Sequence, residues 1–419
     1  MRKNIIWNLV AIAGAVALSG CLGGAPSGGG SGSGSGTGSG DPGAGTGSGT
    51  GSGGSGATGG SGGSGGTTVP KPDPNLAART VDYGQALRTA SLKLVGALPT
   101  MDEQAAVTDA ASYAAAVDRL LADARFATQI RSYFQDMMKM GGTLAARVGA
   151  NTVNVSLDTA PTFAAELVVK DRPITELFTA TTNTCPTLAA DGTFTDASCA
   201  VANGLTTAGV LSDPGAMAQM YSNMAFRRGR WIQESFVCSK YPAEYSAKPV
   251  PMGGGQFTSP WPFTSVSGGT GAAINFQDTQ ALVCENCHGT LNHLVPLFAN
   301  FDAAGVYQTT VQVHTPTPPA PITKLSDWLP AGENLAWRYN KPAATLTELG
   351  AAMAADTDVQ KCQVQRAWNW AMNKTDIVND LAVVPDSTIA DIMAVYTAGG
   401  LKLKPVLKAV FTADDFVKF

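Results

Sequence analysis

A long stretch almost free of apolar side chains sets the first limit on how this 419-residue chain can fold. Residues 22–68 are almost entirely glycine, serine, threonine and alanine. Such a segment cannot bury apolar surface and behaves as a flexible coil, with a root-mean-square span of about 35–40 Å. Folding is therefore confined to about residues 75–419, enough for one large domain or two packed ones.

The first 20 residues have the pattern of an export signal. Arg2 and Lys3 precede an apolar run over residues 5–18 that only Asn8 interrupts. This run is too short to span a bilayer with margin and is typical of a signal-peptide core.

The end of this run resembles the lipobox of bacterial lipoproteins, since residues 18–21 read Leu-Ser-Gly-Cys. The resemblance implies cleavage before Cys21, a lipid anchor on its thiol and no transmembrane helix in the mature protein. An ordinary secretory signal with an incidental cysteine is the alternative. Leu22, rather than Asp, follows the cysteine, which favours the outer membrane. We expect a protein anchored to the bacterial cell envelope, on its periplasmic or surface face.

The charge pattern excludes one class of partner. The net charge is only −4, and no block of basic residues occurs. Nucleic acid is therefore not expected to bind.

The region after the tether has mainly helical patterns. Residues 100–103 and 345–348 have the form of capping boxes, and Gly-Gly pairs at 141–142 and 399–400 are stop signals. Residues 141–160 and 245–280 lack sustained periodicity, and the second stretch predicts a long loop that leads toward residues 284–288. Four apolar stripes fall on helical faces: Tyr113, Val117, Leu120 and Leu121; Phe126, Ile130, Phe134 and Met137; Ile389, Ile392, Met393 and Tyr396; Leu403, Leu407, Val410 and Phe411.

One pentapeptide carries a specific chemistry: residues 284–288 read Cys-Glu-Asn-Cys-His. C-x-x-C-H is the attachment motif of a c-type haem. Cys284 and Cys287 would form thioethers with the porphyrin, and His288 would be the proximal iron ligand. The motif predicts one covalent haem c. Zinc or a bare disulfide is the alternative, although the usual second pair of zinc ligands is missing.

The remaining cysteines form an even set that suits disulfides in an oxidising compartment. Cys185 and Cys199 bracket a short polar loop, so we pair them. Cys238 and Cys362 then form the second pair, which would join the segment before the haem motif to the helices after it. Four unpaired buried thiols are the alternative.

Several segments, in order, resemble the planctomycete-type cytochrome c proteins, exported multi-module proteins of unknown function. The resemblance covers most of residues 80–419 and implies a mainly α fold, in which helical modules surround a cytochrome c-like haem-binding segment. The segments that carry it are residues 92–100, 117–126, 171–177, 208–214, 228–242, 300–305 and 403–416.

The sequence departs from this family after the haem histidine. The family usually has Asp-Pro and then a glycine, where this chain has Asn292, His293 and Val295, and Ala299 replaces a usual glutamate. These changes concern the haem pocket rather than the attachment.

The patterns divide the chain into five parts. They are a signal peptide (1–20), the lipidated cysteine and tether (21–74), an N-terminal helical module (75–205), a haem-binding module (206–340) and a C-terminal helical module (341–419).

The sixth iron ligand decides between electron transfer and small-molecule chemistry. His293 follows His288 too closely to cross the ring, and we expect it to be a pocket or surface residue. The candidates are His314, Met252, Met353 and Met372, and an empty sixth position is as consistent with the sequence.

Three functions fit these observations. The first is a membrane-anchored monohaem c-type cytochrome that transfers electrons to an unknown redox partner protein. The second is a haem enzyme, oxidase- or peroxidase-like, with an open sixth site. The third is a structural or binding surface lipoprotein without haem. No nucleophile elbow, zinc-protease helix or phosphate loop occurs, so the sequence leaves enzymatic activity undecided.

Overall fold

The computed structural model describes residues 78–221, 225–241, 290–309, 334–338, 341–378 and 383–419, and the backbone of 262–264 and 273–275. Residues 72–419 form one compact unit. The signal peptide, Cys21 and the tether lie outside the described residues.

The described part is mainly α, as the sequence predicted. None of its helices is long and apolar enough to cross a membrane. The helices are α2 (Tyr83–Val95), α3 (Met101–Ala105), α4 (Ala110–Ala122), α5 (Phe126–Met138), α6 (Thr159–Val169), α7 (Glu176–Thr179), α8 (Pro214–Gln219), α9 (Phe226–Val237), the 3-10 helix η3 (Val295–Phe298), α11 (Leu346–Ala354), α12 (Thr357–Ala371), α13 (Asp386–Ala398), α14 (Leu403–Phe411) and α15 (Asp414–Val417).

The first predicted capping box is complete. The Thr100 hydroxyl accepts the N–H of Glu103, and the Glu103 carboxylate accepts the N–H of Thr100, so both donors at the start of α3 are satisfied. The second box differs in one bond. Thr345 caps α11 by accepting the N–H of Glu348, but the Glu348 carboxylate accepts the N–H of Ala344, one residue further upstream.

The expected apolar stripes face a shared core. Most of their members are buried in α4, α5, α13 and α14, while Leu120 and Met393 are partly buried at its margin. Helix α6 lies at the centre, because nine consecutive residues from Ala160 to Val168 are buried. A helix that is buried on every side has helices packed around it, and α5, α7, α8 and α14 all contact α6.

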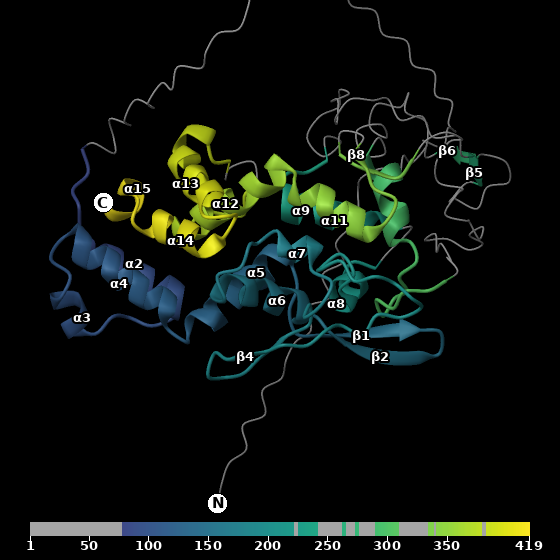
Figure 1. The fold of residues 1–419 in the computed structure, drawn as a ribbon, viewed down its shortest axis with the longest axis horizontal. Helices are drawn as coiled ribbons and strands as arrows, with labels where there is room; N and C mark the ends of the chain where they lie inside the picture. The colour runs from purple at the N-terminus through teal and green to yellow at the C-terminus, as the bar shows by residue number, and fades with distance from the viewer. Residues whose placement is uncertain are drawn as a thin grey trace, which may run out of the picture. The chain divides into compact units, whose positions relative to one another are not determined.

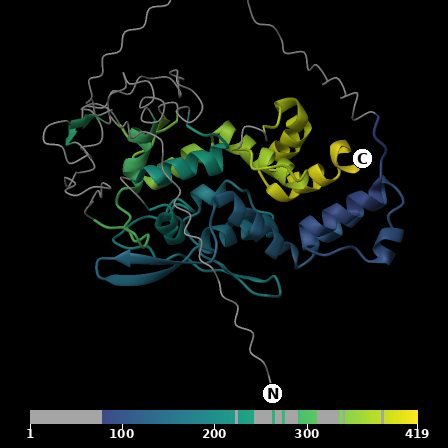
Figure 2. The ribbon, with the colours of Figure 1, turned by 180° about the vertical axis from the view of Figure 1, so that it is seen from behind.

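The C-terminal helices pack against the N-terminal ones. Helix α14 contacts α4 and α6, and α15 contacts α2 (Figure 1). The Tyr113 hydroxyl donates to the carbonyl of Phe411 over 2.8 Å. Figure 2 shows the same neighbourhood from behind. Residues of the predicted N- and C-terminal modules therefore share one hydrophobic core.

A β-hairpin occupies part of the 141–160 stretch, for which the sequence predicted no regular structure. Strands β1 (Thr143–Val148) and β2 (Asn151–Ser156) pair antiparallel, with Val148 opposite Asn151 across a two-residue turn. Only Ala146 and Val155 are buried, so the alternation that signals a strand is nearly absent from the sequence.

The other strands form three short antiparallel pairs. They are β3 (Thr187–Leu188) with β4 (Phe194–Thr195), β5 (Pro262–Thr264) with β6 (Ala273–Asn275), and β7 (Ala336–Trp337) with β8 (Lys341–Pro342). The first pair closes the loop between Cys185 and Cys199, and the second falls in the 245–280 stretch, for which the sequence predicted a long loop.

Candidate functional site

The segment that follows the C-x-x-C-H motif packs directly on α9. Residues 290–294 are helical and continue into η3. A Cβ atom at Gly229 of α9 would lie 2.7 Å from Leu291 Cδ2 and 2.8 Å from Val295 Cγ1. The absence of a side chain at Gly229 therefore permits the close approach. The chain beginning two residues after His288 is held against α9 in this way.

Arg228, the neighbour of Gly229, fixes the end of the same segment. Its guanidinium is buried and donates to the carbonyls of Met217, Phe298, Phe301 and Asp302, over 2.6–3.3 Å. Burial lowers the pKa of this guanidinium, and the carbonyl dipoles around it favour its charged form. One side chain thus joins α8, η3 and the loop after η3.

That loop is organised by the carboxylate of Asp302. It accepts the backbone N–H groups of Ala304 (2.9 Å) and Val306 (3.0 Å) and the side-chain amide of Gln308 (2.8 Å). Gly305 has a φ of +73°, and a Cβ there would lie 2.0 Å from the carbonyl oxygen of Pro214. Glycine is required at this position for both reasons. The family-like residues 300–305 therefore form a tight turn on α8.

Three polar residues directly after the motif are buried. Thr290, Asn292 and His293 are each about one-twentieth exposed, and the last two have interaction partners. From the sequence, His293 was expected to lie either in a pocket or on the surface. The structure shows that it is buried. The departures from the family pattern at 292–293 thus fall on buried positions.

Both expected disulfides are present. Cys238 at the end of α9 is bonded to Cys362 in α12, 124 residues further along the chain. Cys185 is bonded to Cys199, and the closed loop contains the β3–β4 pair. Disulfides persist in oxidising compartments, so both bonds agree with an exported chain.

The Cys185–Cys199 bond has a buried carboxylate beside it. Asp213 Oδ2 lies 3.8 Å from each of the two sulfur atoms, and Asp213 Oδ1 accepts the N–H of Ala216 over 2.7 Å, which caps α8. On the other side, the buried Thr184 hydroxyl donates to Cys199 Sγ over 3.4 Å. Burial raises the pKa of Asp213 to about 6.

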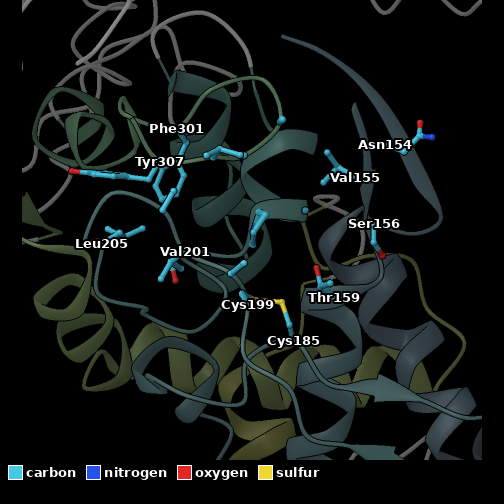
Figure 3. A pocket seen from close by; sticks show the side chains of 18 residues that line it. Asn154, Val155, Ser156, Thr159, Cys185, Cys199, Val201, Leu205, Phe301 and Tyr307 are labelled. Carbon is cyan, nitrogen blue, oxygen red and sulfur yellow. A yellow bond between two sulfur atoms is a disulfide. The ribbon is translucent and has the colours of Figure 1, made fainter. Parts of the chain in front are cut away.

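A cavity of about 310 Å³ opens at this disulfide (Figure 3). Its lining comes from β2, the start of α6, Cys185, the loop that contains Cys199, the start of α8 and the 301–307 loop. Cys185 is partly exposed, whereas Cys199 is buried. Val201, Leu205 and Tyr307 lie on the side of the cavity away from Asn154 and Ser156 and add apolar surface to it.

Among the described residues, the two cysteines of this disulfide and Asp213 form a cluster of potential metal ligands. Ligand atoms of Cys185, Cys199 and Asp213 lie within 4.8 Å of one another. The two sulfurs are bonded to each other and have no thiolate to offer, so this set does not fit a metal ion in the disulfide form.

The predicted haem ligands lie outside the described residues. This applies to Cys284, Cys287 and His288 and to two sixth-ligand candidates, Met252 and His314. The other two candidates lie on described helices. Met353 is fully buried in the hydrophobic core, and Met372 at the end of α12 is packed against it.

Sequence reasoning missed Arg228, Thr184 and Asp213 as individual residues. Asp213-Pro214 does carry a local signal, because an N-cap aspartate before proline is typical of a helix start. Its position beside a disulfide depends on contacts between distant segments, which no local pattern contains.

Comparisons of this chain with protein-family models, with curated proteins and with solved structures found no match.

Proposed function

We propose that this protein is a membrane-anchored monohaem c-type cytochrome that transfers electrons through a covalently bound haem. The observation that carries the proposal is the Cys284-Glu285-Asn286-Cys287-His288 motif in a chain with an export signal. Cys284 and Cys287 would hold the porphyrin, and His288 would bind the iron. The haem supplies a one-electron couple when it is bound.

Two structural observations support this reading. A proximal histidine needs a fixed backbone, and the residues just after His288 are anchored on α9 by Gly229 and Arg228. Covalent haem attachment belongs to exported proteins, and two disulfides within the folded part suit an oxidising compartment. The lipid anchor on Cys21, the outer-membrane location and the redox partner protein are parts of the same proposal.

The first experiment tests covalent haem. The full chain is expressed in a bacterial host that performs c-type maturation, and the membrane fraction is analysed by denaturing electrophoresis with haem staining. We expect a stained band for the native sequence and none for the Cys284→Ser/Cys287→Ser variant, because both thioethers are lost. The matched control, Cys185→Ser/Cys199→Ser, removes another cysteine pair and should keep the stain. An unstained native protein would overturn the proposal.

The second experiment separates electron transfer from small-molecule chemistry. Carbon monoxide is added to the reduced, folded protein, and the absorption spectrum is recorded. An electron carrier with two protein ligands should show no change, because its sixth position is filled. A shifted spectrum would indicate an exchangeable site and favour a haem enzyme instead.

A further inference from the structure

The Cys185–Cys199 disulfide lines a cavity that opens to solvent, with Cys185 partly exposed and Cys199 buried. The second disulfide also has one partly exposed and one buried cysteine, Cys238 at the end of α9 and Cys362 in α12, but neither of them lines this cavity. A dissolved thiol that enters the cavity can therefore reach Cys185 Sγ.

The surroundings of the two sulfurs are also unequal. Cys199 Sγ accepts the Thr184 hydroxyl, a contact that would stabilise negative charge on this sulfur. Asp213 Oδ2 faces both sulfurs at 3.8 Å, although a disulfide has no hydrogen to donate. The N–H of Ala216 is donated to the other oxygen, Oδ1, while Oδ2 lies against the disulfide.

The raised pKa of Asp213 allows this carboxyl group to hold a proton in weakly acidic solution and to give it to a thiolate. Burial raises the pKa of Asp213 to about 6, although hydrogen bonds from Thr159, Ala216 and Gly215 act in the opposite direction. No charged side chain among the described residues contributes to this shift.

The other charged or titratable groups on the neighbouring elements have partners of their own or are exposed to solvent. Arg147 is exposed, and Glu166 and Asp196 both bind Lys170. Asp191 caps its own turn, Asp302 accepts hydrogen bonds from its own loop, and Tyr307 contacts Asn300.

We propose that Cys185–Cys199 is a redox-active disulfide that exchanges with a dithiol reductant entering the cavity, with Asp213 as its proton donor and acceptor. This activity does not depend on haem. Its class is thiol–disulfide exchange, and the reductant is the co-substrate.

A thiolate of the dithiol attacks Cys185 Sγ, the Cys185–Cys199 bond breaks, and Cys199 leaves as a thiolate that takes a proton from Asp213. The second thiol of the reductant gives its proton to Asp213 and attacks the mixed disulfide, so Cys185 leaves as a thiolate and is protonated from solvent. The protein gains two electrons and two protons, and the dithiol becomes a disulfide.

The test measures how fast each disulfide of the folded full chain is reduced by dithiothreitol. Samples are alkylated at intervals, and the four cysteines are counted by peptide mass spectrometry. We expect Cys185–Cys199 to be reduced about tenfold or more faster than Cys238–Cys362. Equal rates for the two disulfides would overturn the proposal.

The pH profile tests the role of Asp213. The rate per dithiothreitol thiolate should be highest below pH 6 and should fall above it, because the donor must be protonated. Asp213→Asn keeps an N-cap for α8 but cannot give up a proton, so its profile should be flat and its rate about tenfold lower at pH 5. A flat profile for the native chain, or an unchanged profile for Asp213→Asn, would contradict the proposal.

A control variant and the native pH profile separate this role from folding. Asp82 caps α2, and its backbone N–H is donated to the carbonyl of Val417. The Asp82→Asn variant should leave the reduction rate of Cys185–Cys199 and its pH profile unchanged. The native pH profile decides the question even if Asp213→Asn does not fold.

Glutathione, a monothiol, tests the order of the two cysteines. It should stop at a mixed disulfide on Cys185, since Cys199 is the buried leaving group beside Thr184. An adduct on Cys199 would contradict this order of attack.

Discussion

Arg228 shows how one buried side chain can hold several segments through their backbone carbonyls. It is only 1% exposed, and among the described residues its hydrogen bonds go to backbone carbonyls rather than to a carboxylate. A buried charge is tolerated when its donors are all used. The rings of Tyr221 and Phe301 lie 5.4 and 5.7 Å from its guanidinium carbon and add cation–π attraction.

Replacing Arg228 with methionine should therefore be costly. The carbonyls of Met217, Phe298, Phe301 and Asp302 would lose their donor inside the protein, and we expect a loss of about 3 kcal/mol or more in the free energy of unfolding. Urea denaturation followed by tryptophan fluorescence measures it.

The matched control is Arg230→Met on the same helix. Arg230 is 46% exposed and pairs with Glu234, so its loss should cost less than about 1 kcal/mol. Similar losses at the two positions would show that the carbonyl contacts of Arg228 contribute little.

At the scale of elements, the contact between the 301–307 loop and α8 depends on a missing side chain. Gly305 and Gly204 have the same φ of +73°, but only Gly305 meets a neighbour, the Pro214 carbonyl. Alanine substitutions at the two positions therefore separate the free-energy cost of a positive φ from the cost of the steric contact with Pro214.

We expect Gly204→Ala to lower the free energy of unfolding by about 1 kcal/mol, because alanine is strained at positive φ. Gly305→Ala should lower it by about 3 kcal/mol or more, since the added carbon also pushes the loop away from α8. Urea denaturation measures both losses. Equal losses for the two variants would mean that the 301–307 loop can move away from α8 without a further loss in the free energy of unfolding.

Elements that bury many apolar side chains could be predicted from the sequence, and elements that bury few could not. Helices α4, α5, α13 and α14 could be predicted because their buried residues recur at helical spacing. The β1–β2 hairpin could not, since only Ala146 and Val155 are buried in its two strands. The cavity could not be predicted either, because its walls come from several segments spread over residues 154–307.

For the whole molecule, the two disulfides constrain the chain to very different extents. Cys238–Cys362 spans 124 residues and joins the helix before the C-x-x-C-H motif to a helix of the C-terminal part, whereas Cys185–Cys199 spans 14. Both pairings could be predicted, because Cys185 and Cys199 bracket a short polar loop and their pairing leaves Cys238 with Cys362. The proximity of Asp213 to one of them could not, because it requires the folded chain.

Loss of the longer link should destabilise the protein more. On the chain-entropy argument the 124-residue loop contributes about 5 kcal/mol and the 14-residue loop about 3 kcal/mol. We expect Cys238→Ala/Cys362→Ala to lose more free energy of unfolding than Cys185→Ala/Cys199→Ala, in urea titrations without reductant. The reverse order would show that native contacts of the cysteines outweigh loop closure.

The pairing of Thr80 with Phe419 has a consequence for the order of folding. The two residues exchange backbone hydrogen bonds, and Asp82 bonds to Val417 beside them. A ribosome makes residue 419 long after residue 80, so α2 and α4 emerge well before their partners α14 and α15 exist. The parts of α2 and α4 that α14 and α15 cover stay exposed until residues 403–417 are made, and the nascent protein must be kept from aggregating until then.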